Sequence, residues 1–121
     1  MKKDPYIVAK IRDLVDKYDE LINKMKILKE KIRESPEIFD ELSSILLKIH
    51  RETQRIVNIC RDKNTELDEE YLIFLQTYCD YLVLISIPYV IELLNNMKNN
   101  VKESNDRDIE KMIRLFNELI A

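Results

Sequence analysis

The sequence predicts an all-α fold, an antiparallel bundle of four to five helices, and three observations support this prediction. Apolar side chains between residues 7 and 32 recur alternately four and three residues apart, which aligns them along one side of a helix. The 121-residue chain has no glycine, although tight hairpin turns usually need it. Two of its three prolines, Pro5 and Pro36, stand where a helix would begin. The aligned apolar residues are Ile7, Ile11, Leu14, Tyr18, Leu21, Met25, Leu28 and Ile32.

The first two predicted helices span residues 5–33 and 36–62. Each starts at a proline that follows a capping side chain, Asp4 in the first helix and Ser35 in the second. The short break between them makes the two helices antiparallel neighbours. Further apolar residues lie beside the aligned ones and widen the apolar side of the first helix. An apolar side of this width suits a helix with two neighbours in a bundle better than a helix in a two-stranded coiled coil. These residues are Val8, Val15 and Ile22.

The most apolar segment is the third predicted helix, residues 66–86, which opens with a capping-box pattern. Pro88 removes an amide donor and clashes with the preceding turn, so we expect a kink or a break there. A short fourth helix over residues 88–100 and a last amphipathic helix over residues 105–120 follow. Together the helices make one domain, residues 1–121.

Residues 71–94 would be long enough to cross a membrane. Polar residues interrupt this stretch, however, and its longest uninterrupted apolar run is too short for a span. We therefore expect a central helix that is buried on most sides, and no membrane association. The interrupting residues are Gln76, Asp80, Pro88 and Glu92.

Composition and charge exclude several classes of function. Without glycine the chain has no dinucleotide-binding or P-loop fingerprint. Its net charge is −3, although 36% of its residues are charged, so bulk electrostatics does not favour nucleic-acid binding. Cys60 and Cys79 show no metal-ligand spacing, and no apolar signal segment opens the chain. We expect reduced thiols and a cytoplasmic protein.

No group of residues spells out a catalytic, cofactor or metal site. His50 is the single histidine and has no second ligand at helical spacing, so we interpret it as a helix-flank residue. Two acidic clusters lack the oxygen-ligand loop of a cation site, and we assign them to a solvent face and to a first helical turn. We expect no enzyme activity and no cofactor. The clusters are Asp13, Asp16, Asp19 and Glu20, and Asp68, Glu69 and Glu70.

Clustered tyrosines in the third helix and its continuation indicate a protein interface. Tyrosine is enriched at interfaces because its ring is apolar while its hydroxyl needs a polar partner. The large apolar area in this part of the chain makes a partly exposed docking surface nearly as good an interpretation as full internal burial. The candidate interface residues are Tyr71, Phe74, Tyr78, Tyr81 and Tyr89.

Two basic patterns are each open to two interpretations. Lysines recur every seven residues beside the apolar side of the first helix. Their alkyl chains could cover apolar surface, or the lysines could form a basic rail that binds an acidic partner helix. The outer face of the second helix is basic. It could be a solvated face, or a strip that contacts the phosphates of a nucleic acid. No aromatic residue lies between the basic ones to stack on bases. The basic rail is Lys10, Lys17, Lys24 and Lys31. The candidate phosphate-contacting residues are Lys48, Arg51, Arg55 and Arg61.

In residues 50–82, an Arg-bearing helix is followed by a leucine before several acids and then by a helix with aromatic residues near its first turns. This pattern resembles the helical domain of GINS subunits, components of the archaeal and eukaryotic replicative helicase. The resemblance covers about residues 6–85, but the family's small β-rich second domain and any counterpart to the helices after Pro88 are missing. It implies a non-catalytic scaffold whose helices pack against sister subunits. The matching residues are Arg51, Arg55, Ile56, Leu67, Glu70, Phe74 and Tyr78.

The sequence therefore favours a non-enzymatic helical protein–protein interaction module, a subunit or adaptor of a larger assembly of archaeal or viral origin. A DNA-replication scaffold is its most concrete form, and we expect protein partners or self-association into an oligomer. One alternative is a small nucleic-acid-associated accessory protein that uses the basic face of the second helix. Another is a small viral or mobile-element protein that acts on a host partner.

Overall fold

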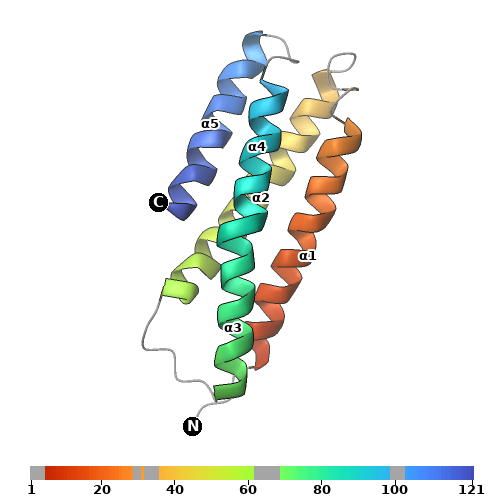
Figure 1. Ribbon diagram of the computed structural model, residues 1–121. Coiled ribbons are helices and arrows are strands. Elements are labelled where there is room, and N and C mark those ends of the chain that lie inside the picture. The colour runs from red at the N-terminus through yellow and green to blue at the C-terminus, as the bar shows by residue number, and fades with distance from the viewer. Residues whose placement is uncertain (1–4, 29–30, 32–35, 62–68, 99–102) are drawn as a thin grey trace.

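The computed structural model describes residues 5–28, 31, 36–61, 69–98 and 103–121, and every regular element among them is helical (Figure 1). The predicted all-α bundle is confirmed. Three of the elements follow one another without a break and form one long helix of 29 residues. The elements are α1 (Pro5–Leu28), α2 (Pro36–Arg61), α3 (Glu69–Tyr81), the π-helical turn η1 (Leu82–Ser86), α4 (Ile87–Met97) and α5 (Glu103–Ile120).

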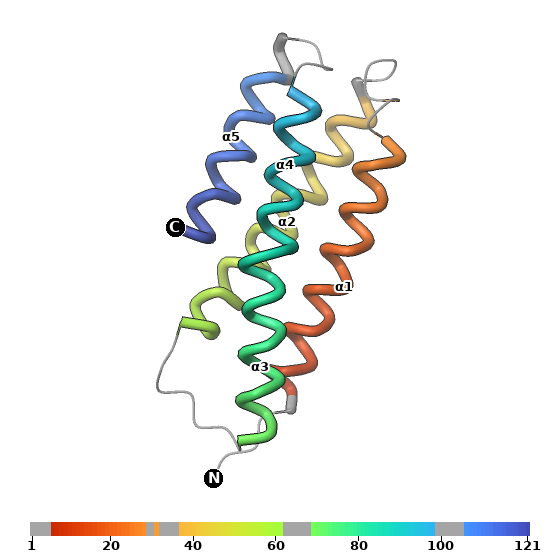
Figure 2. The backbone as a smooth tube through the Cα atoms, in the orientation of Figure 1, coloured from red at the N-terminus to blue at the C-terminus, as the bar shows by residue number. Residues whose placement is uncertain are grey.

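Successive helices alternate in direction (Figures 1 and 2). α1 and the long helix α3–η1–α4 run one way, and α2 and α5 run the other way. α1 packs against α2 and the long helix, while α5 packs against α2 and α4. α5 has only 18 residues and ends partway along the bundle.

The predicted heptad of the first helix forms the inner side of α1. Its five central side chains are at most 2% exposed and share one core with side chains from all the other helices. Burying an aliphatic or aromatic side chain of this size stabilises a fold by about 1.5–3 kcal/mol. The stripe is thus covered within the chain, while Ile32 lies outside the described residues. The five are Ile11, Leu14, Tyr18, Leu21 and Met25.

The ends of the helices differ from the prediction by a few residues. α1 and α2 start at the predicted prolines. α1 stops before residue 33, because the amide of Lys31 donates to Leu28 O over 2.9 Å and Lys31 lies in a turn. α5 starts two residues earlier than predicted. The predicted N-caps of the first three helices lie outside the described residues.

Pro88 does not break the long helix, so the prediction of two separate helices over residues 66–86 and 88–100 is wrong. The expected kink at Pro88 stays a prediction. The helix adjusts just before the proline. There the amide of Ile87 donates to Leu82 O, five residues back, in the π turn. A π turn leaves one carbonyl without an amide partner, and proline has no amide proton to donate. The π turn before Pro88 therefore lets the helix continue without the hydrogen bond that proline cannot form.

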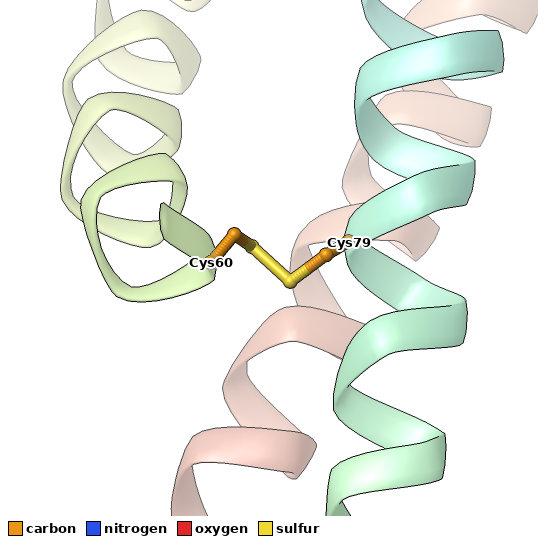
Figure 3. The surroundings of a disulfide bond; sticks show 2 residues. All are labelled: Cys60 and Cys79. Carbon is orange, nitrogen blue, oxygen red and sulfur yellow. A yellow bond between two sulfur atoms is a disulfide. The ribbon is translucent and has the colours of Figure 1, made fainter. Parts of the chain in front are cut away.

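Cys60 and Cys79 form a disulfide, and the expectation of reduced thiols is therefore wrong (Figure 3). The two sulfur atoms are 2.07 Å apart and the two Cα atoms 5.9 Å apart. Cys60 lies in the last turn of α2 and Cys79 in α3, so the bond joins these two helices across the bundle. The residue numbers of the two cysteines differ by 19. The sequence could not show their pairing because helical periodicity does not say where two helices cross.

One pair of polar side chains is buried between α1 and α2. Thr53 donates its hydroxyl proton to Ile49 O over 2.6 Å, so the phenol of Tyr18 is the donor in its hydrogen bond to Thr53 Oγ1. Both side chains are 0% exposed. The two bonds satisfy groups that water cannot reach and fix the register of α1 against α2. Burial raises the pKa of the Tyr18 phenol well above its usual value.

By length and composition alone, the long helix could cross a membrane. Its most apolar 18-residue window has a mean hydropathy of 1.4, and 39% of that window is buried within the bundle. A core helix also satisfies this criterion, and Leu82, Ile87 and Val90 of this helix are 0% exposed.

Candidate protein interface

The five candidate interface residues all lie on the side of the long helix that borders α1. Three of them line a surface cavity of about 350 Å³, and the other two line a second cavity of about 430 Å³. α1 supplies the opposite wall of both cavities. Because α1 and the long helix run in the same direction, the cavities follow each other along one boundary (Figure 1). We call this row the tyrosine seam: Tyr71, Phe74 and Tyr78 at the first cavity, and Tyr81 and Tyr89 at the second.

The rings of the tyrosine seam differ in burial. Tyr71, Tyr78 and Tyr89 are partly buried and pack against the hydrophobic core. Phe74 and Tyr81 are 47% and 39% exposed. Core packing therefore holds three of the rings, and the other two leave apolar area at the surface. Rings held by a core present apolar area in fixed positions, as anchor residues of interfaces do.

Charged groups of both signs from α1 surround these rings. Arg12 lines the first cavity, and Asp19 and Lys26 line the second. The Nζ atom of Lys26 lies 5.0 Å from the centre of the Tyr89 ring. A cation–π contact at such an exposed position is worth about 0.5–1 kcal/mol. The seam is thus an apolar centre with a mixed charged rim, and sequence reasoning did not identify these residues of α1 as part of it.

Ser86 is a further residue that sequence reasoning missed. It belongs to the π turn and to the wall of the second cavity. Its hydroxyl oxygen is buried and has no hydrogen-bond partner among the described residues. Buried polar groups are nearly always paired, so this hydroxyl is a weak point in the packing of η1 against α1. No sequence signal could have found it, because the π turn itself was not predicted.

The structure groups three of the four candidate phosphate-contacting residues and separates the fourth. Lys48, Arg51 and Arg55 recur at spacings of three and four on one face of α2. Arg61 instead contacts the end of α5: its Nη2 atom donates to Leu119 O over 3.1 Å and to Ala121 O over 2.9 Å. The bond to Leu119 O caps a carbonyl in the last turn of α5 that would otherwise lack a helical partner. Arg61 therefore has a structural role.

Two lysines of the basic rail form ion pairs with acids of α2 in the same chain. Lys17 Nζ lies 2.9 Å from Glu52 Oε2, and Lys24 Nζ lies 3.5 Å from Glu41 Oε1. Exposed ion pairs of this kind contribute about 0–1 kcal/mol each. Two surface cavities of about 260 and 530 Å³ lie between α1 and α2. The larger effect of the two ion pairs is to place carboxylates among the basic side chains around these cavities. This lowers the positive potential of that surface.

His50 packs between α2 and α5, and the described residues of the acidic clusters lie at the surface. His50 Nε2 lies 3.2 Å from Leu115 O, and its ring meets that of Phe116 edge-on at 5.6 Å between centres. A carbonyl only accepts, so Nε2 carries the proton, and the imidazole joins α2 to α5. Within the described ranges, no group of three or more His, Cys, Asp or Glu side chains could hold a metal ion. The residues of the first acidic cluster are exposed on α1. Glu69 and Glu70, at the start of α3, are also exposed.

A scan against protein-family models finds no match to this chain, and searches of the curated proteins and of solved structures find none either.

Proposed function

We propose that this protein is a non-enzymatic helical interaction module, a subunit or adaptor that binds a protein partner through the tyrosine seam. The observation that carries the proposal is a row of five aromatic rings along two neighbouring cavities. Tyr71, Tyr78 and Tyr89 pack against the core, and Phe74 and Tyr81 are 47% and 39% exposed. Rings that are already fixed lose little freedom on binding, and aromatic residues dominate interface hot spots. The charged groups around them suit the polar rim of an interface.

The most concrete form of the proposal is a replication-complex scaffold, as the resemblance to GINS subunits implies. Phe74 and Tyr78 of the matching residues belong to the tyrosine seam, and Arg51 and Arg55 lie on the outer face of α2. In this form the partner is a sister subunit whose helix occupies the seam. A small viral or mobile-element protein would use the same seam on a host protein. The cytoplasmic location remains part of the proposal; an intracellular disulfide would then be typical of a hyperthermophile.

We expect Phe74→Ser combined with Tyr81→Ser to weaken binding of the partner by about 30-fold or more, since each ring is an interface anchor and the loss of one hot spot costs about 2 kcal/mol. The partner is first identified by mass spectrometry after affinity capture with the wild-type chain. Its dissociation constant is then measured with purified components by calorimetry.

The matched control for this experiment is Ile27→Ser. Ile27 is a large apolar residue of α1, 66% exposed, that lies outside the cavities of the seam. The control variant should bind as the wild type does. Unchanged affinity of the seam variant, with its helical circular-dichroism spectrum intact, would reject the proposal.

The grouping of Lys48, Arg51 and Arg55 on one face of α2 keeps a nucleic-acid-associated function as the second candidate. That function predicts salt-sensitive binding of short single- and double-stranded oligonucleotides, because each phosphate contact releases counterions. Arg51→Glu with Arg55→Glu would then abolish the binding. The proposed function predicts instead that titrations at low and moderate salt show no difference between this variant and the wild type.

A further inference from the structure

Three charged residues of α1 stand along the tyrosine seam at intervals of seven residues, and their signs alternate. Arg12 lines the first cavity, and Asp19 and Lys26 line the second. All three are exposed. Seven residues are about two helical turns, so the three side chains leave α1 in nearly the same direction, about 10.5 Å apart along its axis. We call these three residues the seam charges.

The seam charges differ from the basic rail on the other side of α1. Two lysines of the rail form ion pairs with acids of α2. Among the described residues, no ion pair includes Arg12 or Asp19, and Lys26 contacts the ring of Tyr89. The seam charges can therefore pair with groups outside the chain.

The long helix gives the seam an apolar wall with the spacing of a coiled coil. Five of its cavity-lining residues recur alternately three and four residues apart, as the a and d positions of a heptad do. Phe74, Tyr81 and Ile85 are exposed. A second helix with the same period can insert its apolar side chains between those of this wall. The five residues are Tyr71, Phe74, Tyr78, Tyr81 and Ile85.

Resting on the proposed function, we propose that the seam binds an amphipathic helix of the partner whose flank carries an acid, a base and an acid at seven-residue intervals. The apolar side of this helix packs on the wall of the long helix. Its two acids pair with Arg12 and Lys26, and its base pairs with Asp19. Flanking charges of this kind select the partner in coiled coils. The order of signs is the same from either end, so it suits both directions of the partner helix.

The spacing of the seam charges favours a helix over an extended strand as the occupant. In a helix that packs alongside α1, residues seven apart recur at the same interval of about 10.5 Å. Residues on one face of a strand recur about every 6.6 Å and fall out of step with the seam charges. Strand addition also needs a free sheet edge, and every regular element among the described residues is helical.

Two synthetic helices test the proposal on the full-length protein. Both are about three heptads long, stapled so that they are helical when free, and carry leucine at the core positions. Beside the core, one peptide has glutamate, lysine and glutamate at seven-residue intervals, and the other has lysine, glutamate and lysine. Fluorescence anisotropy at low ionic strength measures the two dissociation constants.

We expect the wild type to bind the Glu-Lys-Glu peptide at least about tenfold more tightly than the Lys-Glu-Lys peptide, because three attractions replace three repulsions. The net charge of the protein is −3, so bulk electrostatics alone would favour the second peptide. A preference for the first peptide therefore reports on the seam charges.

Reversing the seam charges should reverse the preference. The variant with Arg12→Glu, Asp19→Lys and Lys26→Glu should bind the Lys-Glu-Lys peptide at least about tenfold more tightly than the other. A matched control adds the same two units of negative charge at exposed positions of α2 and α5, and it should keep the preference of the wild type. The control substitutions are Arg51→Glu, Asp108→Lys and Lys111→Glu.

Four results would overturn the proposal. They are equal affinities of the wild type for the two peptides, a preference that the seam-charge variant retains, and no binding of either peptide. The fourth is a wild-type dimer in sedimentation equilibrium that the seam-charge variant does not form, which would assign the seam to a second copy of the chain.

The partner captured from cells separates this proposal from the proposed function. Its affinity should fall at least about tenfold in the seam-charge variant. If the affinity falls only in the Phe74 and Tyr81 variant, the partner binds the seam without the charged flank, so the proposed function stands and the charge-complementary helix is rejected. If the affinity falls in neither variant, the proposed function is rejected as well.

Discussion

Replacing Tyr18 with alanine should lower the free energy of unfolding by about 3–5 kcal/mol, because it removes a fully buried aromatic ring and leaves a cavity. Tyr18 is 0% exposed and lies in the middle of the inner side of α1. Domains of this size are stable by about 5–15 kcal/mol, so the loss is a large part of the total. Urea unfolding followed by circular dichroism measures it. A loss below about 1 kcal/mol would contradict the packing of α1 described here.

The hydroxyl of Tyr18 should contribute much less than its ring. Tyr18→Phe removes the hydroxyl but leaves Thr53 bonded to Ile49 O, so we expect a loss of about 0.5–1.5 kcal/mol. Thr53→Val should cost more, about 1–3 kcal/mol, since it leaves a buried phenol without an acceptor. Adding Tyr18→Phe to Thr53→Val should therefore restore part of the stability. Strict additivity in this double-mutant cycle would exclude the hydrogen bond.

The raised pKa of Tyr18 adds a pH dependence that the phenylalanine variant lacks. In the unfolded chain the phenol ionises near pH 10, while in the folded protein burial keeps it protonated to higher pH. The stability that Tyr18 adds in this way is fully present below about pH 10 and is lost as pH rises, by up to about 1.4 kcal/mol per pH unit. Above that pH, wild-type stability should fall toward that of Tyr18→Phe and then below it.

Reducing the Cys60–Cys79 disulfide should destabilise the fold by about 3 kcal/mol. The bond closes a loop between two cysteines 19 residues apart, and such a cross-link restricts the unfolded chain. Urea unfolding with and without a phosphine reductant measures the effect. In the oxidised protein, thiol titration should find no free cysteine.

The control for the disulfide is the variant with both Cys60→Ala and Cys79→Ala. Its stability should resemble that of the reduced wild type, and the reductant should not change it. Two free thiols in the non-reduced wild type, or equal stability with and without reductant, would contradict the pairing seen in Figure 3.

The periodicity of apolar residues predicted the helices, because each helix buries one apolar side and the residues of that side recur at helical spacing in the sequence. The heptad around Tyr18 and the start at Pro36 are examples. The uninterrupted passage through Pro88 was not predictable in the same way. Propensity rules assign proline a clash, whereas the π turn before it removes the conflict. The Cys60–Cys79 bond depends on how α2 crosses the long helix, which no local pattern specifies.

The candidate interface was predicted in part. Tyrosine clustering indicated five residues that the fold places along two neighbouring cavities, and their role as an interface stays a prediction. The walls from α1, such as Arg12 and Lys26, follow from the parallel alignment of two helices far apart in the sequence. Among the candidate phosphate-contacting residues, the position of Arg61 at the end of α5 follows only from the folded chain.

Site-specific photo-crosslinking in source-cell extract tests the central claim, that a protein partner binds at the tyrosine seam. A benzophenone side chain is placed at Tyr81, in the seam, or at Arg51, on the exposed outer face of α2, and the products are identified by mass spectrometry. The account predicts one dominant heterologous product from the Tyr81 position, absent from the Arg51 position and lost when Phe74→Ser is added. Equal product patterns from both positions, or no heterologous product from Tyr81, would contradict it.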